Sequence, residues 1–170
     1  MKNLNLLILF TFLCANAFAA EPKLNDLAPL FSAKTHEGKT FELASRKGKW
    51  TVLYFYPKAG TPGCTKQACA FRDSIAKIRT LGAEVYGISA DSIDEQANFH
   101  KEHHLNFDLL ADPDAIVIKL YGADRLLIKM SKRWTYIINP ELKIKNIMKD
   151  VDPVLDADRV AAKIAELQKP

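Results

Sequence analysis

Residues 51–74, TVLYFYPKAGTPGCTKQACAFRDS, constrain the fold of this chain more than any other stretch. Positions 52–56 are aromatic, aliphatic or β-branched, which is typical of a buried central strand. Pro57 ends this run because proline cannot donate to a sheet ladder. Thr61 and Pro62 then predict a helix start, with a hydroxyl N-cap and proline at the first helical position. We therefore expect a buried strand, a tight turn and a helix in immediate succession.

The apolar spacing of that helix predicts which face it buries. Five residues recur at i, i+4, i+7, i+11 and i+14 and form one inward-facing stripe: Cys64, Ala68, Phe71, Ile75 and Ile78. Cys64 is the first of them, so it is expected in the first turn, facing the sheet. Free N–H groups and the helix dipole favour an anion there, and a thiolate is such an anion. Cys64 is thus predicted to be a reactive thiolate at the carboxyl end of a central strand, where open α/β folds place their sites.

A second cysteine follows on the same helix. Cys69 is five residues beyond Cys64, so it points about 140° away and lies about 7.5 Å further along the helix axis. The Cα atoms of a disulfide are about 4.4–6.8 Å apart, so these two residues cannot join while the helix is intact. The spacing predicts two states, one reduced and helical, the other oxidised with its first turns unwound.

The block around these cysteines is highly specific. It reads TPGCT at 61–65, then Cys69, then FRD at 71–73, after the strand and turn YFYPKAG. It resembles the peroxiredoxins, in particular the bacterioferritin comigratory protein or PrxQ group, and the resemblance extends from about Leu24 to the end of the chain.

The resemblance implies an activity and a site. It implies a thiol peroxidase that reduces hydrogen peroxide and organic hydroperoxides without a cofactor or metal. Cys64 would be the peroxidatic nucleophile and Cys69 the resolving cysteine, joined in an intramolecular disulfide that a thioredoxin-like donor reduces. Thr61 and Arg133 would assist catalysis, while three residues would position the substrate: Pro57, Pro62 and Gly63. It also implies a monomer.

The remaining pattern alternates strands with helices, which predicts an α/β fold. Strands are expected at 40–43, 84–89, 107–111, 134–138 and 142–148, the last two paired as a hairpin. Helices are expected from the capping box at Ser92 to about 104, from Asp112-Pro113 to about 122, and from Asp152-Pro153 onwards. Periodicity alone also allows a flavodoxin-like sheet. The resemblance selects a thioredoxin-like fold, a central mixed sheet flanked by helices.

Residues 1–20 have the features of a secretory signal peptide. Lys2 precedes an apolar run at 4–13, and the triplet 17–19 is a small-x-small cleavage site. The run is too short for a stable membrane anchor. We therefore expect cleavage, loss of Cys14, a single domain at 21–170 and a periplasmic location.

Composition and motifs also bear on alternative functions. The net charge of +4 comes from basic residues scattered among acidic ones, so nucleic-acid binding is poorly supported. A secreted thiol–disulfide oxidoreductase remains open, although such proteins carry CxxC at the helix start. A copper-binding thioredoxin-like chaperone also remains open, since thiolates suit Cu(I). His100, His103 and His104 have helical spacing compatible with a metal, although a solvated helix face explains them equally well.

Overall fold

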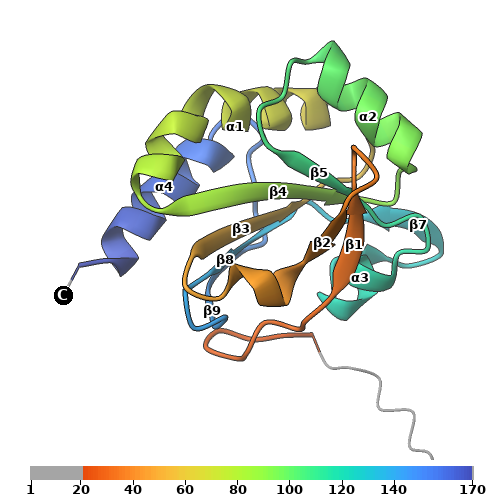
Figure 1. Cartoon of the computed structure of the whole chain (residues 1–170). Coiled ribbons are helices and arrows are strands. Elements are labelled where there is room, and N and C mark those ends of the chain that lie inside the picture. The colour runs from red at the N-terminus through yellow and green to blue at the C-terminus, as the bar shows by residue number, and fades with distance from the viewer. Residues whose placement is uncertain (1–20, 170) are drawn as a thin grey trace, which may run out of the picture.

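Strand β3 (Trp50–Phe55) is an interior strand of a seven-stranded mixed sheet with the order β2-β1-β5-β4-β3-β8-β9 (Figure 1). The computed structural model describes residues 21–169, so the predicted signal segment lies outside the described residues. β3 pairs in parallel with β4 (Ala83–Ser89) and antiparallel with β8 (Trp134–Ile138). The predicted α/β fold with a central mixed sheet is confirmed.

The other elements complete the sheet and its two covering layers. The remaining strands are β1 (Ser32–Thr35), β2 (Thr40–Glu42), β5 (Asp108–Ala111) and β9 (Ile144–Met148), with a separate hairpin of β6 (Asp124–Arg125) and β7 (Ile128–Ser131). The helices are α1 (Pro62–Thr80), α2 (Ile93–Glu102), α3 (Ile116–Leu120) and α4 (Asp156–Leu167), with a 3₁₀ turn at Leu43–Arg46. None of the described helices is long and apolar enough to cross a membrane.

Helices cover both faces of the sheet, and β3 is buried on both. Figure 1 shows α1, α2 and α4 above the sheet and α3 below it. Val52 and Tyr54 pack into the upper core with α1 and α4, whereas Leu53 and Phe55 pack into the lower core with α3. Because successive strand residues point to opposite faces, a strand covered on both sides becomes the unbroken apolar run seen in the sequence.

Helix α1 follows the predicted spacing. Thr61 is the N-cap residue and Pro62 the first helical residue, and the five predicted stripe residues are all buried. The helix ends before Gly82, whose φ of +70° is the left-handed conformation common just after a helix. The stripe brings Cys64 onto the sheet-facing side of the first turn.

Two predicted helix starts were wrong. Helix α3 begins at Ile116 rather than at Asp112, because Ala115 adopts a left-handed φ of 55° that interrupts the helix. The Asp112 carboxylate still accepts from the Ile116 amide at 2.9 Å. Helix α4 begins at Asp156, since the residues after Asp152 form a turn in which the Asp156 amide donates to the Asp152 carbonyl at 3.0 Å. In both cases the aspartate–proline pair opens a turn before the helix.

The strand boundaries differ from the sequence pattern by a few residues. The strand expected at 40–43 ends at Glu42, and the one expected at 142–148 begins at Ile144 because Leu142 has a φ of 60°. The capping box of α2 is confirmed. β1 and the β6–β7 hairpin were not predicted. At the tip of that hairpin Leu126 and Leu127 are 86% and 93% exposed.

Candidate active site

Cys64 is the third residue of α1, at the carboxyl end of β3. Its side chain is buried, with 1% of the residue exposed, and it is not in a disulfide. The amides of Gly63 and Cys64 lie in the first turn, where helical N–H groups have no acceptor within the helix. The position therefore favours negative charge on the sulfur.

Arg133 reaches this cysteine from the neighbouring strand. It directly precedes β8, and Trp134 is paired with Phe55 at the end of β3, so the sheet register brings Arg133 beside the start of α1. Its Nη2 donates to Cys64 Sγ at 3.5 Å. Its Nη1 donates to Gln67 Oε1 at 2.5 Å. The structure thus brings two of the predicted site residues together and fixes the guanidinium from a second direction.

Gln67 was missed by the sequence reasoning. It lies one turn after Cys64 on the same face of α1 and is completely buried. While its oxygen accepts from Arg133, its Nε2 donates to Asp156 Oδ2 at 2.7 Å. The only local signal was a polar residue beside Ala68 in an otherwise apolar stripe. Such a residue must have hydrogen-bond partners when it is buried.

Asp156 is the acceptor on the far side of Gln67. It is the first residue of α4 and is 1% exposed, and Thr135 Oγ1 of β8 donates to the same carboxyl oxygen at 2.8 Å. Burial raises the pKa of Asp156, and the hydrogen bonds from Gln67 and Thr135 oppose that shift. Its other oxygen, Oδ1, is buried without a hydrogen-bond partner among the described residues.

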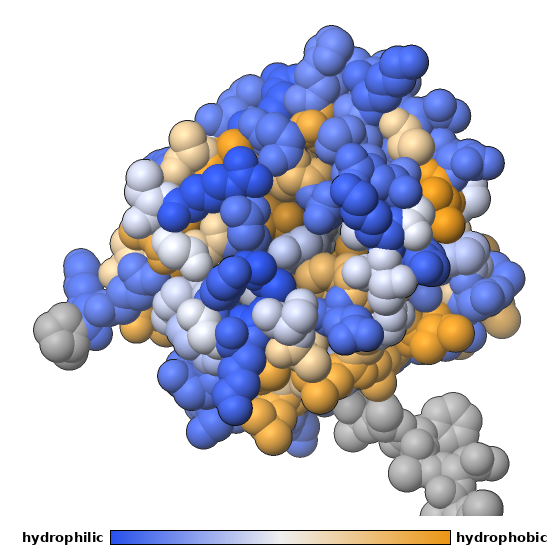
Figure 2. Space-filling view, in the orientation of Figure 1, coloured by the Kyte–Doolittle hydropathy of each residue, from blue (hydrophilic) through white to orange (hydrophobic). Residues whose placement is uncertain are grey.

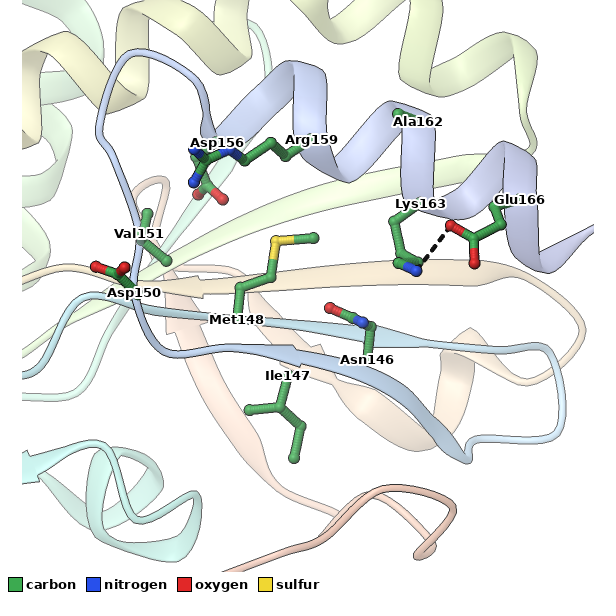
Figure 3. Close-up of a pocket in the computed structure, with 10 residues that line it drawn as sticks. All are labelled: Asn146, Ile147, Met148, Asp150, Val151, Asp156, Arg159, Ala162, Lys163 and Glu166. Carbon is green, nitrogen blue, oxygen red and sulfur yellow. Dashed lines mark hydrogen bonds and ion pairs between the residues drawn. The ribbon is translucent and has the colours of Figure 1, made fainter.

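A cavity of about 450 Å³ lies beside Asp156, between β9 and α4 (Figure 3). Asn146 and Met148 point from β9 towards α4, while Ile147 points to the opposite face of the sheet. Arg159 also lines the cavity from the α4 side. Neither cysteine is part of the lining, so the cavity adjoins the cysteine site only through Asp156.

Thr61 is placed at the helix start, but its hydroxyl does not cap the helix as predicted. Thr61 Oγ1 instead donates to the Lys58 carbonyl oxygen at 2.9 Å, and no cap bond to the first turn is present. The Lys58 carbonyl competes successfully because the turn that follows Pro57 brings it back over the Thr61 side chain. With its proton directed to Lys58, the hydroxyl oxygen retains lone pairs that can accept a hydrogen bond.

Glycine at position 63 allows Arg133 to approach the helix. A Cβ atom built on Gly63 would lie 3.2 Å from Arg133 Nη2 and 3.9 Å from Pro153 Cγ. Pro62 is exposed at the first helical position, and Pro57 lies in the turn between β3 and α1. These prolines shape the backbone around Cys64.

Cys69 is half-buried on α1 and is also not in a disulfide. The helix is continuous from Pro62 to Thr80, so both cysteines are part of regular helix. The described conformation is the reduced, helical one of the two that the spacing predicts.

Two further side-chain groups lie near the ends of the sheet. Trp134, next to Arg133, has the ammonium groups of Lys132 and Lys149 at 4.6 and 4.3 Å from its ring centroid. His100 stacks on His36 with 3.8 Å between ring centroids, and the described residues hold no group of three side chains that could bind a metal. Burial, with a contribution from His36, lowers the pKa of His100.

The strand order, together with a reduced cysteine in the first turn of α1, places the chain among the thioredoxin-like thiol proteins. It belongs to the AhpC/TSA family, whose profile matches residues 24–147. Similar curated proteins are peroxiredoxins, which confirms the predicted resemblance.

Two of these relatives show the extent of the similarity. The chain is 42% identical over 125 residues to the chloroplastic peroxiredoxin Q of Populus jackii, covering 73% of this chain and 59% of the relative. It is 46% identical over 95 residues to the putative peroxiredoxin bcp of Coxiella burnetii, covering 56% of this chain and 63% of the relative. The chain therefore spans about three fifths of the length of these curated relatives.

Solved structures show the same fold. Peroxidoxin BcpB of Mycobacterium tuberculosis superposes with a TM-score of 0.81 at 30% identity, covering 88% of this chain and all of that one. The bacterioferritin comigratory protein of Xanthomonas campestris, described for its alkyl peroxide reduction activity, gives a TM-score of 0.78 at 26% identity over 82% of this chain and 92% of that one. The predicted thioredoxin-like peroxiredoxin fold is confirmed.

Proposed function

We propose that this protein is a thiol peroxidase that reduces hydrogen peroxide and organic hydroperoxides through Cys64. The observation that carries the proposal is the contact between Arg133 Nη2 and Cys64 Sγ at 3.5 Å, at a helix start. The peroxiredoxin relatives and the alkyl peroxide reduction described for the Xanthomonas campestris protein support it.

In the first step the Cys64 thiolate attacks one peroxide oxygen in line with the O–O bond. The S–O bond forms as the O–O bond breaks, so the sulfur is oxidised by two electrons to a sulfenic acid. The other oxygen leaves with the electron pair of the broken bond, takes up a proton and departs as water or an alcohol.

The surrounding groups can stabilise the negative charge that develops on the peroxide oxygens in this step. Arg133 and the free amides of Gly63 and Cys64 offer fixed donors to the peroxide oxygens, and such preorganised donors stabilise negative charge that forms in a transition state. The Thr61 hydroxyl, whose proton is donated to the Lys58 carbonyl, can accept a hydrogen bond from the peroxide O–H through its oxygen. Each group takes a role that its hydrogen bonds in the resting structure permit.

In the second step Cys69 resolves the oxidised cysteine. Its thiolate attacks the Cys64 sulfur, so that the S–S bond forms as the S–O bond breaks. The sulfenic oxygen leaves as hydroxide, which takes up a proton and becomes water. The first turns of α1 must unwind beforehand, since the two positions are too far apart in a helix. The disulfide also protects Cys64 from further oxidation to sulfinic acid.

A dithiol must then return two electrons and two protons to the disulfide. We propose that this donor is a thioredoxin-like protein. We also propose that the peroxidase itself is a monomer. We further propose a periplasmic location, which the signal-like features of residues 1–20 support and in which a membrane-fed thiol carrier would supply the electrons. Fractionation that finds the uncleaved chain mainly in the cytoplasm would contradict this location.

The test is a peroxide titration of the reduced protein followed by intact mass. A Cys14→Ser background leaves Cys64 and Cys69 as the only thiols, because the chain has three cysteines. We expect rapid loss of both thiols and a mass lower by two hydrogens. Cys64→Ser should not react, whereas Cys69→Ser should react once and accumulate sulfenic or higher acids. Oxidation no faster than that of a free thiol would overturn the proposal.

A further inference from the structure

We propose that Asp156 is a positioning residue that holds the start of α1 in its helical, peroxide-reactive form and must release Gln67 before Cys64 and Cys69 can join. We call the hydrogen-bonded group of Asp156, Gln67 and Thr135 the Asp156 latch. The inference rests on the proposed function and extends it to a residue of α4 that touches neither cysteine.

The fixed side of the Asp156 latch lies outside α1. The carboxylate belongs to α4, and Thr135 Oγ1, which donates to it at 2.8 Å, belongs to β8. β8 is paired on both sides, with β3 and with β9. The pairing of β8 does not depend on the first turns of α1, so Thr135 stays beside the Asp156 carboxylate when these turns unwind.

The moving side is Gln67, which lies between the two cysteines in the sequence. No unwinding that brings Cys64 to Cys69 can leave Gln67 in its helical position. Both polar atoms of its side-chain amide form hydrogen bonds: Nε2 donates to Asp156 at 2.7 Å, and Oε1 accepts from Arg133 at 2.5 Å. Release of Gln67 thus breaks the bond to Asp156 and also frees the guanidinium that contacts the Cys64 sulfur.

The surroundings of Asp156 make such release reversible. A buried carboxylate that loses a hydrogen bond is strongly destabilised unless another donor replaces it. Asp156 keeps the Thr135 hydroxyl, and it lines the cavity between β9 and α4, which offers water a route to the carboxylate (Figure 3). Asn146 Oδ1, in the same lining, is also buried without a partner among the described residues, so this side of the cavity is polar.

The Asp156 latch affects the two chemical steps in opposite directions. It favours the first step, because it fixes Arg133 against Cys64 through Gln67. It opposes the second step, because its bond to Gln67 must break before the disulfide forms. It also stabilises the reduced protein relative to the disulfide form, so its loss makes the reduction potential of the Cys64–Cys69 pair more negative.

The experiment compares Asp156→Ala and Asp156→Asn with a matched control, all in the Cys14→Ser background. Asp158→Asn removes the same charge from the first turn of α4 at an exposed position. Rapid quenching and mass spectrometry give the rates of sulfenic acid and disulfide formation, and glutathione buffers give the reduction potential.

For Asp156→Ala we expect sulfenic acid formation to slow by about tenfold and disulfide formation to accelerate by about tenfold. If the equilibrium constant for reduction of the disulfide also changes tenfold, the reduction potential becomes about 30 mV more negative. Asp156→Asn retains an acceptor oxygen and should show smaller changes in the same directions. Asp158→Asn should match the parent. A merely structural role would slow both steps together, and this outcome or unchanged rates would overturn the inference.

A second variant approaches the same hydrogen bond from α1. Gln67→Met keeps the length of the side chain without its amide, so it should reproduce the opposite changes in the two rates even if Asp156→Ala fails to fold. The parent protein separates the two proposals. If the parent protein does not lose both thiols to peroxide, the proposed function fails. If the parent protein does lose both thiols, but the Gln67 and Asp156 variants leave both rates and the reduction potential unchanged, only the Asp156 latch fails.

Discussion

Replacing Gly63 by alanine should make this protein more stable and yet slower with peroxide. The new Cβ would lie 3.2 Å from Arg133 Nη2, which is closer than such contacts usually are, and 3.9 Å from Arg133 Cζ and Pro153 Cγ. The guanidinium must therefore move by a few tenths of an ångström. It has little freedom to do so while Nη1 is bonded to Gln67 at 2.5 Å, so the contact with Cys64 Sγ is the one expected to lengthen.

The expected magnitudes follow from these contacts. Alanine is about 0.5–1 kcal/mol better than glycine inside a helix, and Gly63 has no left-handed φ that would forbid it. For a domain of this size that gain corresponds to a rise of about 1–4 °C in Tm. Complete loss of a donor to a developing oxyanion typically costs about 10²–10³ in rate, so partial displacement of Arg133 should slow sulfenic acid formation by about tenfold. A more stable helix start should also slow disulfide formation by about two- to fivefold.

Thermal unfolding and rapid-quench mass spectrometry of Gly63→Ala measure both effects on one sample. Ser74→Ala is the matched control, because it also raises helix propensity in α1 but lies two turns or more beyond the Arg133 contacts. It should raise Tm and leave both rates unchanged. A Gly63→Ala protein with a lower Tm and the parent rate would refute the assignment of Arg133 to the reacting sulfur.

Three further predictions concern other parts of the molecule. Arg133→Met should slow the first step by about 10²–10³ in stopped-flow assays, and a change below about threefold would contradict its role as a donor. The pKa of His100 is lowered below 6.5 by burial and His36, so the folded protein binds this proton less readily than the unfolded chain. Its stabilising contribution is therefore complete above pH 6.5 and is lost as the pH falls below that value, and His100→Gln should flatten that part of the urea stability profile. Leu127→Asn should raise stability by about 0.5–1 kcal/mol in urea unfolding, because Leu127 is exposed with a φ of 70°, and a loss of stability would contradict this reading.

The parts of the site that depend on local periodicity were predictable. The stripe on α1 placed Cys64 in the first turn facing the sheet, and the structure confirms that position. The Arg133 prediction came from the family resemblance, and the pairing of β8 with β3 explains how it reaches Cys64. The Cys64 placement needed only the helical phase, whereas the Arg133 placement depended on the family resemblance.

The contacts that sequence reasoning missed depend on distant parts of the chain. Gln67 and Asp156 are 89 residues apart, so no local pattern pairs them. Helix α4 was expected to start at Asp152, which would have made Asp156 an ordinary residue of its second turn. The Thr61 hydroxyl was assigned to the helix because the competing Lys58 carbonyl is brought near only by the turn. Tertiary contacts decided each of these cases.

The two ammonium groups around Trp134 give the molecule an intrinsic optical probe. Trp134 is 9% exposed and adjoins Arg133, with Lys132 and Lys149 close to its ring, so its emission depends on the local field of three cations. Trp50, the only other tryptophan, begins β3 at the end of the strand remote from Cys64. In a Trp50→Phe protein, a change in Trp134 fluorescence on addition of peroxide would therefore report a movement of Arg133, without any attached dye.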